Sequence, residues 1–160
     1  MPSPTHRDHA YWMGKALAQA ARAEARGEVP IGAVIVHEGR VIARAFNCRE
    51  TAQDPAGHAE LLAIRKAARY LQRWRLTDVT LYVTLEPCLM CTGAIILARI
   101  PTVVYGCHDP KAGALGSQYD LSNESALNHR FEVIAGVEEE RCSRQLSDFF
   151  KQLRLSRSSR

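Results

Sequence analysis

The sequence predicts a three-layer α/β/α domain built around a mixed five-stranded sheet. Three observations lead to this fold class: helical and strand patterns alternate along the 160 residues, the first two strands are close enough to form a hairpin, and two later strands are separated by a helix. A hairpin pairs its strands antiparallel, whereas a strand–helix–strand unit favours parallel pairing with a right-handed crossover. We therefore expect both kinds of pairing in one sheet.

The first half of the chain predicts a helix, a hairpin and a second helix. Residues 8–26 show an amphipathic pattern, with a tryptophan, a leucine and several alanines on the buried side. Residues 33–36 and 40–43 are typical of strands, and the three residues between them predict a turn. Apolar residues then recur at helical spacing over residues 58–71, which predicts a helix against the sheet.

The second half repeats the alternation and supplies the other three strands. Residues 79–85 are rich in β-forming side chains, and a proline at position 87 then suits the start of a helix over residues 89–98. Residues 102–105 and 131–135 predict two short strands. A last helix is expected to begin near Glu138, with leucine and phenylalanine side chains on one face. The elements placed are five strands and four helices, and about five helices are expected in all.

Composition indicates one domain and excludes several classes of protein. With 46% apolar residues, a chain of 160 residues can bury one ordinary core, so we expect a single domain over residues 1–160. Residues 1–7 are expected to be flexible, and residues 151–160 to form a basic helix end or tail. No apolar run approaches the ~20 residues needed to cross a bilayer, and the N-terminus lacks a signal-peptide pattern. We therefore expect a cytoplasmic location without membrane contact.

The charges and the cysteines further limit the classes of protein that fit this sequence. Five cysteines with uneven spacing argue against a secreted disulfide scaffold and favour metal-binding or catalytic thiols. The net charge of +4 is only mildly basic. After Asp148 the chain carries no acidic residue but four basic ones, at positions 151, 154, 157 and 160. A solvated helix end explains these cations as well as a nucleic-acid contact does, and both interpretations stay open.

Two short motifs carry the chemistry: His58-Ala59-Glu60 and Pro87-Cys88-Leu89-Met90-Cys91. Each lies at the start of a predicted helix, where free amide groups and the helix dipole favour a thiolate over a thiol. Cys88 and Cys91 are one helical turn apart, so both sulfurs can face the same point. One imidazole and two thiolates make three protein ligands, which leaves the fourth tetrahedral position of a zinc ion open to water. Such an open site is catalytic.

Three other interpretations of these motifs compete with a catalytic zinc site. A Cys-x-x-Cys pair can be a redox centre, although a histidine at another helix start gives the pair a natural metal partner. A closed structural zinc site would need a fourth ligand, for which Cys48, Cys107 and His108 are candidates without the usual paired spacing. Finally, His58 and Glu60 could form only a helix cap, since acidic residues are stabilising in a first turn. That would leave the cysteines unexplained.

Taken together, the motifs resemble the bacterial tRNA-specific adenosine deaminases, within the cytidine deaminase superfamily. The His-x-Glu and Pro-Cys-x-x-Cys pattern is typical of zinc deaminases in general. The later segments narrow the resemblance to the tRNA branch, and it runs from about Tyr11 to Phe150. The segments that carry it are VPIGAV (29–34), HAE (58–60), TLEPCLMC (84–91), DPKAGALGS (109–117), NHR (128–130) and LSDFF (146–150).

The resemblance implies a cytidine-deaminase-like fold, one zinc ion per subunit, a homodimer, and a tRNA anticodon stem-loop as partner. It implies hydrolytic deamination of adenosine to inosine at the wobble position. The implied site residues are the zinc ligands His58, Cys88 and Cys91, the proton shuttle Glu60, and the substrate contacts Asn47, Asp109 and Lys111. For Asn47 an ordinary strand-end turn residue is the alternative, because asparagine often has that role.

Two rival functions share part of this pattern. A deaminase of free bases or nucleosides, such as guanine or cytosine, would carry the same zinc motifs but would act on a small substrate. A zinc-stabilised RNA-binding module would bind RNA without turnover. The segment 109–117 and the basic C-terminal residues disfavour the first rival. Glu60 disfavours the second, because a purely structural site has no use for a carboxylate beside an open metal position.

Overall fold

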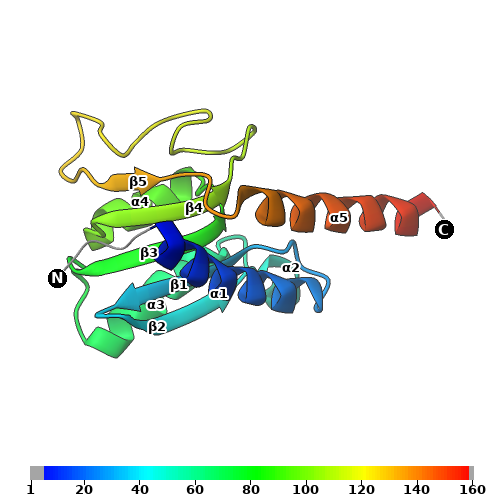
Figure 1. The fold of residues 1–160 in the computed structure, drawn as a ribbon, viewed down its shortest axis with the longest axis horizontal. Helices are drawn as coiled ribbons and strands as arrows, with labels where there is room; N and C mark the ends of the chain where they lie inside the picture. Colours follow the sequence, from blue (N-terminus) through cyan, green and yellow to red (C-terminus); the bar gives the residue numbers. More distant parts are fainter. Residues whose placement is uncertain (1–5, 159–160) are drawn as a thin grey trace.

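The fold was analysed in a computed structural model that describes residues 6–158. Helices and strands alternate along the chain, as the ribbon in Figure 1 shows. Their bounds are α1 (His6–Glu24), β1 (Gly32–His37), β2 (Arg40–Phe46), α2 (Arg49–Ala52), α3 (Ala59–Leu71), β3 (Val79–Leu85), α4 (Leu89–Ala98), β4 (Thr102–Cys107), β5 (Glu132–Ile134) and α5 (Glu139–Ser158).

The five strands form one sheet in the order β2-β1-β3-β4-β5. The hairpin strands β1 and β2 are antiparallel, and β1 also pairs antiparallel with β3. The β3–α4–β4 unit joins parallel strands, and β4 pairs parallel with β5. The sheet is therefore mixed, as the sequence predicted. β1 and β3 lie inside the sheet, which explains why their sequences are almost continuously apolar.

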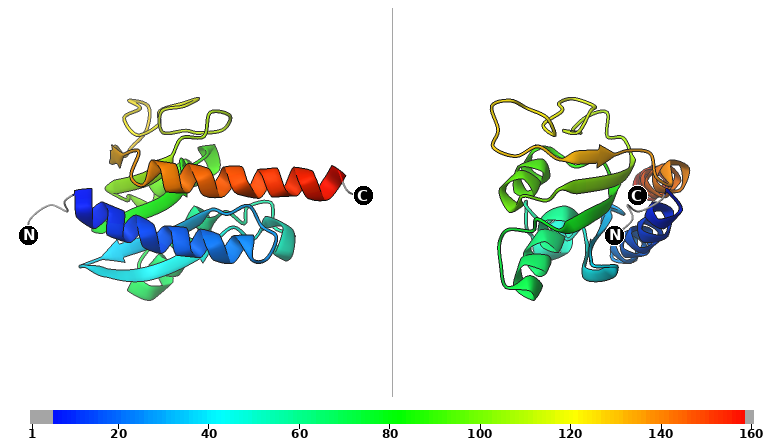
Figure 2. Two further views of the ribbon diagram at one scale, coloured as in Figure 1. Left: turned by 45° about the vertical axis from the view of Figure 1, so that its right-hand side comes forward. Right: turned by 60° about the vertical axis from the view of Figure 1, so that its left-hand side comes forward.

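Helices cover both faces of the sheet and give the three predicted layers (Figure 2). On one face, α3 and α4 pack on inward side chains that include Ile35, Leu81 and Val103. On the other face, α1 and α5 pack on the alternate residues of the same strands, such as Tyr82 and Val104. This division follows from the two-residue period of a strand, which sends successive side chains to opposite faces.

Helix α1 lies very close to β1, because both elements present small residues where they meet. Ala16, Ala20 and Ala23 of α1 are fully buried. A Cβ atom at Gly32, the first residue of β1, would collide with backbone atoms of Ala16 and Ala20. Only glycine fits there without displacing the helix. This close contact determines the position of the start of β1 relative to α1.

The differences from the predicted elements lie mainly at the ends. The short helix α2 was not predicted, and β5 has three residues where five were expected. His6 and Arg7 already belong to α1, while the rest of the segment 1–7, for which flexibility was predicted, lies outside the described residues. Within residues 6–158, no helix is both long enough and apolar enough to span a bilayer.

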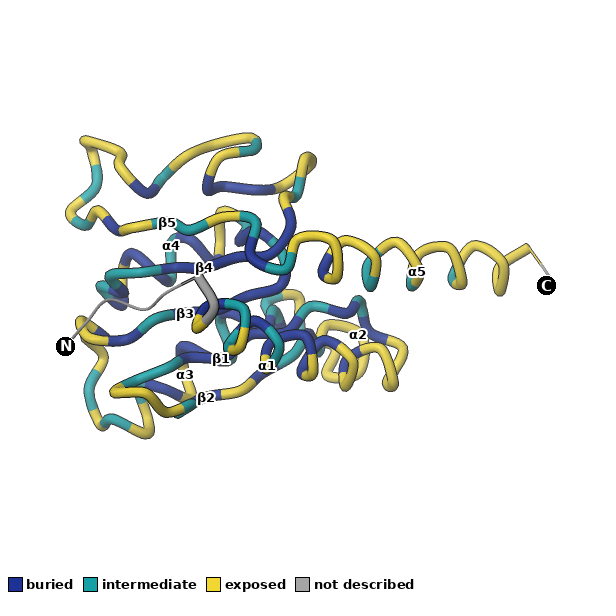
Figure 3. Tube along the Cα trace, in the orientation of Figure 1, coloured by how far each residue is buried: buried dark blue, intermediate teal, exposed yellow. Residues whose placement is uncertain are grey.

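Helix α5 extends well past the body of the protein (Figure 1). Its first turns pack against the sheet, where Cys142 is buried, but its C-terminal half is almost entirely exposed (Figure 3). The predicted basic end at 151–160 is thus helical up to Ser158, and the final two residues lie outside the described part. The exposed half carries Lys151, Arg154 and Arg157 into solvent.

Candidate metal centre and active-site pocket

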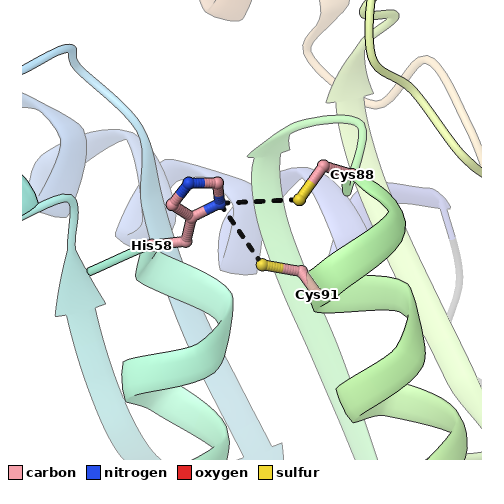
Figure 4. Close-up of side chains that lie close together, drawn as sticks. All are labelled: His58, Cys88 and Cys91. Atoms are coloured by element: carbon pink, nitrogen blue, oxygen red, sulfur yellow. Dashed lines mark hydrogen bonds between the residues drawn. The ribbon is translucent and has the colours of Figure 1, made fainter. Parts of the chain in front are cut away.

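Two helix N-termini on one face of the sheet bring the predicted metal ligands together. His58 directly precedes α3 and Cys88 directly precedes α4, and both residues have an extended backbone. Free amide groups and the positive end of each helix dipole therefore surround the site, which favours anionic ligands. Cys91 lies in the first turn of α4, and Figure 4 shows its sulfur directed toward the same imidazole nitrogen as that of Cys88.

The three ligand atoms have the spacing of a zinc site. Nδ1 of His58 lies 3.6 Å from Sγ of Cys88 and 3.5 Å from Sγ of Cys91 (Figure 4). With Zn–S of about 2.3 Å and Zn–N of about 2.0 Å, tetrahedral coordination places nitrogen and sulfur about 3.5 Å apart. The donor set and the distances fit zinc without rearrangement.

The cluster has three members and does not close with a fourth. Among the described residues, the one group of histidine, cysteine and acidic side chains able to share an ion is His58, Cys88 and Cys91. Cys48, Cys107 and His108, the candidates for a closed structural site, are not part of it. Three protein ligands leave one tetrahedral position for water, which is the arrangement of catalytic zinc.

The thiols of the cluster are strongly coupled to each other. A hydrogen bond from the Cys91 thiol lowers the pKa of Cys88 to about 3, and His58 contributes in the same direction. The same bond raises the pKa of Cys91, because that thiol is held as the donor. A hydrogen bond to Cys88 also raises the pKa of His58. The lowered pKa of Cys88 favours its thiolate, the form that binds metals.

Glu60 follows His58 by two residues and is almost completely buried, with 4% of its surface exposed. Burial raises the pKa of Glu60 to about 7, because a charged carboxylate loses its hydration there; the nearby Cys88 acts in the same direction. A group that titrates near neutral pH can both accept and return a proton during one reaction cycle. Glu60 has the position and the proton affinity of a general acid and base.

Asn47 comes directly after β2 and lies next to the metal ligands. Its Oδ1 accepts a hydrogen bond from the amide of Ala59 at 2.9 Å, which links the end of β2 to the first turn of α3. The side chain is 5% exposed and lines the pocket beside His58. This bond joins two separate elements and is not the local turn of the alternative interpretation, and it fixes the orientation of the Asn47 amide at the pocket wall.

A pocket of about 590 Å³ connects the predicted site residues. Its wall includes Asn47, His58, Glu60 and Cys88, together with the loop residues Asp109 and Lys111. Cys91 is fully buried behind this wall. A volume of this size accommodates a nucleobase and part of its ribose rather than a helical nucleic acid. The flanking chain of a larger substrate would remain outside, over the loop residues.

The loop after β4 presents Asp109 and Lys111 at the mouth of the pocket. Oδ1 of Asp109 accepts hydrogen bonds from the amides of Lys111 (3.1 Å) and Ala112 (3.2 Å), so the carboxylate stabilises the turn of its own loop. Lys111 is exposed. Its cationic side chain is therefore accessible to a phosphate group of a bound nucleic acid.

Several pocket residues were missed by the sequence analysis. Arg49, from the unpredicted helix α2, and His108 line the wall, and so do Leu146 and Phe150 of α5. The two α5 residues had been expected to contribute to a buried apolar face. Their role at the pocket depends on how α5 packs across the sheet, for which the local sequence carries no signal.

Glu86 was also missed, although a carboxylate between an apolar strand and Pro87-Cys88 is an unusual feature of the sequence. It lies in the pocket wall, and the residue is 2% exposed. Burial acts to raise the pKa of Glu86, but hydrogen bonds from Ser117 and from the amides of Asp109 and Leu115 outweigh it and lower the pKa. The signal was present, but its partners are distant in the sequence.

Comparison with known proteins identifies the family. The model of the MafB19-like deaminases matches residues 7–154. A tRNA-specific adenosine deaminase of Bacillus subtilis is 52% identical over 143 residues, which cover 89% of each chain. The chain belongs to the tRNA-specific adenosine deaminase family. The corresponding protein of Haemophilus influenzae is 46% identical to this deaminase, over 89% of this chain and 83% of its own.

Solved structures support the same assignment for this deaminase. A structure from a study of A-to-I editing by tRNA:A34 deaminases at the wobble position of transfer RNA matches with a TM-score of 0.82 and 43% identity. The match covers 85% of this chain and 99% of that one. A guanine deaminase from Bacillus subtilis matches at 41% identity with a TM-score of 0.60, over 62% of this chain and 64% of its own. The likeness to the tRNA deaminase is the more complete.

Proposed function

We propose that this deaminase hydrolyses adenosine to inosine, with release of ammonia, at the wobble position of tRNA anticodons. The observation that carries the proposal is the three-membered cluster of His58, Cys88 and Cys91, with the buried carboxylate of Glu60 beside it in one pocket. An open zinc position next to a proton carrier is the equipment needed for hydrolytic deamination of a base. The same pocket has a loop suited to phosphate contact at its mouth.

In this proposal His58, Cys88 and Cys91 hold one zinc ion in each subunit. When bound, zinc supplies Lewis-acid activation and lowers the pKa of water from 15.7 toward ~7. The protein supplies the ligands at two helix starts, so that the backbone amides and dipoles described above stabilise both sulfur anions. These ligands are on rigid elements of the fold, which keeps the geometry ready before substrate arrives.

Glu60 moves the protons of the reaction. It takes a proton from the attacking water and passes it to N1 of the adenine ring, which makes C6 more electrophilic. Water oxygen then bonds to C6. Glu60 next delivers the second water proton to the exocyclic amine, and the C6–N6 bond breaks to release ammonia. The near-neutral pKa of Glu60 suits both directions of transfer.

The target base has to leave its stack in order to enter the pocket, at a cost of a few kcal/mol. An anticodon loop lowers that cost, because its bases are already unpaired. Asn47, whose amide is oriented by the Ala59 hydrogen bond, is proposed to hydrogen-bond the base. Asp109 and Lys111 are proposed to contact the nucleotides on either side, since they lie at the pocket mouth.

We further propose one deaminase domain over residues 1–160, a homodimer, and a cytoplasmic location. Support for the dimer comes from α4, whose surface exposes Leu89 (48%), Met90 (39%) and Leu97 (70%). Grouped apolar side chains on a helix surface favour a protein partner. A reducing compartment that contains tRNA would keep the free cysteines reduced and supply the substrate. Sedimentation or light scattering measures the oligomeric state directly.

The decisive experiment is incubation of the zinc-loaded protein with a stem-loop that carries adenosine at the wobble base. Inosine should form at that base alone, with an equal amount of ammonia. A stem-loop with guanosine at the wobble position and adenosine elsewhere in the loop is the matched control. Absence of inosine from the first substrate, with zinc bound, would contradict the proposal.

Free guanine, cytosine and adenosine test the remaining enzymatic candidate. The partial match to a guanine deaminase gives that candidate its basis. Turnover of a free base at a rate above that of the stem-loop would assign the pocket to a small substrate. Binding of the stem-loop without release of ammonia would instead indicate an RNA-binding module.

A further inference from the structure

Glu86 is a carboxylate enclosed by protein, at the junction between β3 and the start of α4. None of its side-chain surface is exposed. A buried carboxylate is costly unless most of its lone pairs accept hydrogen bonds, because it has lost its hydration. Glu86 plays no part in the chemistry proposed above, so the presence of a buried carboxylate in this place needs a physical reason. The identity of its partners supplies one.

Four hydrogen bonds to Glu86 come from three residues of a single loop, and Nδ1 of His108, just before that loop, lies 3.5 Å from Oε1. Oε1 accepts from the amide of Asp109 at 3.1 Å and from the hydroxyl of Ser117 at 2.5 Å. Oε2 accepts from the amides of Leu115 (3.0 Å) and Ser117 (3.1 Å). The four donors match a group that only accepts, and an ionised carboxylate is such a group. Glu86 thus holds both ends of the 109–117 loop.

The packing of the loop shows that it is built around this carboxylate. At Gly113, a Cβ atom would occupy the same space as the carboxyl group of Glu86. Gly116 has a φ of +141°, a conformation that residues with side chains rarely adopt. The amide of Ala114 also donates to the carbonyl of Pro87 at 2.9 Å. The loop is therefore attached to the two residues that immediately precede the metal ligand Cys88.

We propose that Glu86 is a positioning residue. Its hydrogen bonds hold the 109–117 loop, which carries Asp109 and Lys111, at a fixed distance from the metal centre. This inference rests on the proposed function for its substrate, an adenosine within an RNA loop. Through Cys88 on one side and the 109–117 loop on the other, Glu86 fixes the distance between the reacting base and its flanking nucleotides. Loss of the hydrogen bonds between Glu86 and the 109–117 loop should weaken recognition of RNA while the metal site stays intact.

The test is Glu86→Gln, which keeps the size of the side chain but presents an NH₂ group to donors that need an acceptor. We expect the KM for the anticodon stem-loop to rise roughly tenfold or more, because a misplaced binding loop loses its contacts with the substrate. Zinc content should stay at one ion per chain, and kcat should change far less than KM. The amides of Leu115 and Ser117 should exchange with solvent roughly tenfold faster.

Two further variants separate positioning from mere stability. Tyr82 lies in β3, the strand that precedes Glu86, and its side chain is on the sheet face that α1 and α5 cover. Tyr82→Phe removes a buried hydrogen bond to His9 (2.8 Å) there. It should lower the free energy of unfolding but leave KM and the 109–117 amides unchanged. Ser117→Ala removes one of the four bonds and should raise KM about threefold. If Glu86→Gln cannot be purified, Ser117→Ala carries the test alone.

The outcomes are distinguishable. If Glu86→Gln or Ser117→Ala shifts KM no more than Tyr82→Phe does, the positioning role is overturned. Unchanged hydrogen exchange of the Leu115 and Ser117 amides in Glu86→Gln would overturn the claim that Glu86 holds the 109–117 loop. If the wild-type protein does not deaminate the stem-loop, the proposed function fails; the exchange measurement, which needs no substrate, then still decides whether Glu86 holds the loop.

Discussion

Replacing Glu60 by glutamine should have opposite effects on activity and on stability. The substitution keeps the size of a side chain that is 4% exposed, so packing is preserved, but it removes the group that carries protons. Positioned general acid–base catalysis contributes about 10²- to 10⁴-fold to a rate. We expect kcat on the stem-loop to fall by about that factor, equivalent to roughly 3–5 kcal/mol in the transition state.

The stability effect follows from the pKa of Glu60, which burial raises from 4.5 to about 7. Below pH 4.5 the group is protonated in both folded and unfolded chains and carries no penalty. Between pH 4.5 and 7 the unfolded chain loses its proton first, so the metal-free wild type becomes less stable as pH rises. The full penalty is on the order of 3 kcal/mol above pH 7. Glutamine stays neutral and avoids it.

Urea unfolding of metal-free protein at pH 5 and pH 8, with a reductant present, measures this difference. The glutamine variant should gain stability over wild type at pH 8 and much less at pH 5. Glu50→Gln, an exposed carboxylate on α2, is the matched control and should change neither quantity. A zinc-loaded Glu60→Gln enzyme with activity within tenfold of wild type would refute the shuttle. A variant that is less stable than wild type at pH 8 would refute the burial argument.

Three other substitutions test the metal site, the fold and the RNA contact. Cys91→Ser should abolish zinc binding, measured by metal analysis, and should lose activity with it, because a third ligand is missing. Gly32→Ala should lower the free energy of unfolding by about 1–3 kcal/mol, since the new Cβ collides with the backbone of α1 at Ala16. Lys111→Gln should raise KM with little change in kcat and should reduce the salt dependence of stem-loop binding by about one charge.

Each of these three has a control or a contrary outcome. Full zinc content in Cys91→Ser would exclude that residue as a ligand. Gly14→Ala is the matched control for Gly32→Ala, because nothing lies within 4 Å of the added atom and an interior helical glycine is unfavourable by up to about 1 kcal/mol. The control should therefore be neutral or stabilising. An unchanged salt slope in Lys111→Gln would show that this lysine does not contact phosphate.

The cluster of His58, Cys88 and Cys91 could be predicted because its geometry is almost entirely local. Cys88 and Cys91 are brought together by one helical turn, and His58 and Glu60 by the first turn of another helix. Only the proximity of the N-termini of α3 and α4 depends on the tertiary structure. The alternation of helices and strands predicted the layers, and the hairpin and the strand–helix–strand unit predicted a mixed sheet, because the length of a connection decides whether two strands pair antiparallel or parallel.

The parts of the site that were missed all depend on contacts between distant segments. Helix α2 has four residues, too few for a periodic pattern, yet it brings Arg49 to the pocket. Leu146 and Phe150 line the pocket because α5 crosses the sheet beside it. For Glu86, the partners lie 23 to 31 residues along the chain. No local preference reveals such a contact.

The sequence was enough to predict the alternation of elements and the cluster of His58, Cys88 and Cys91, because each depends on residues a turn or a strand apart. The tertiary structure alone decided how the 109–117 loop is attached to the metal centre, and that α5 completes the pocket wall and then leaves the body. The physical reason is that the hydrogen-bond partners of a buried charge such as Glu86 are whichever groups the folded chain brings next to it, however distant they are in the sequence. Spacing along the sequence cannot supply that information.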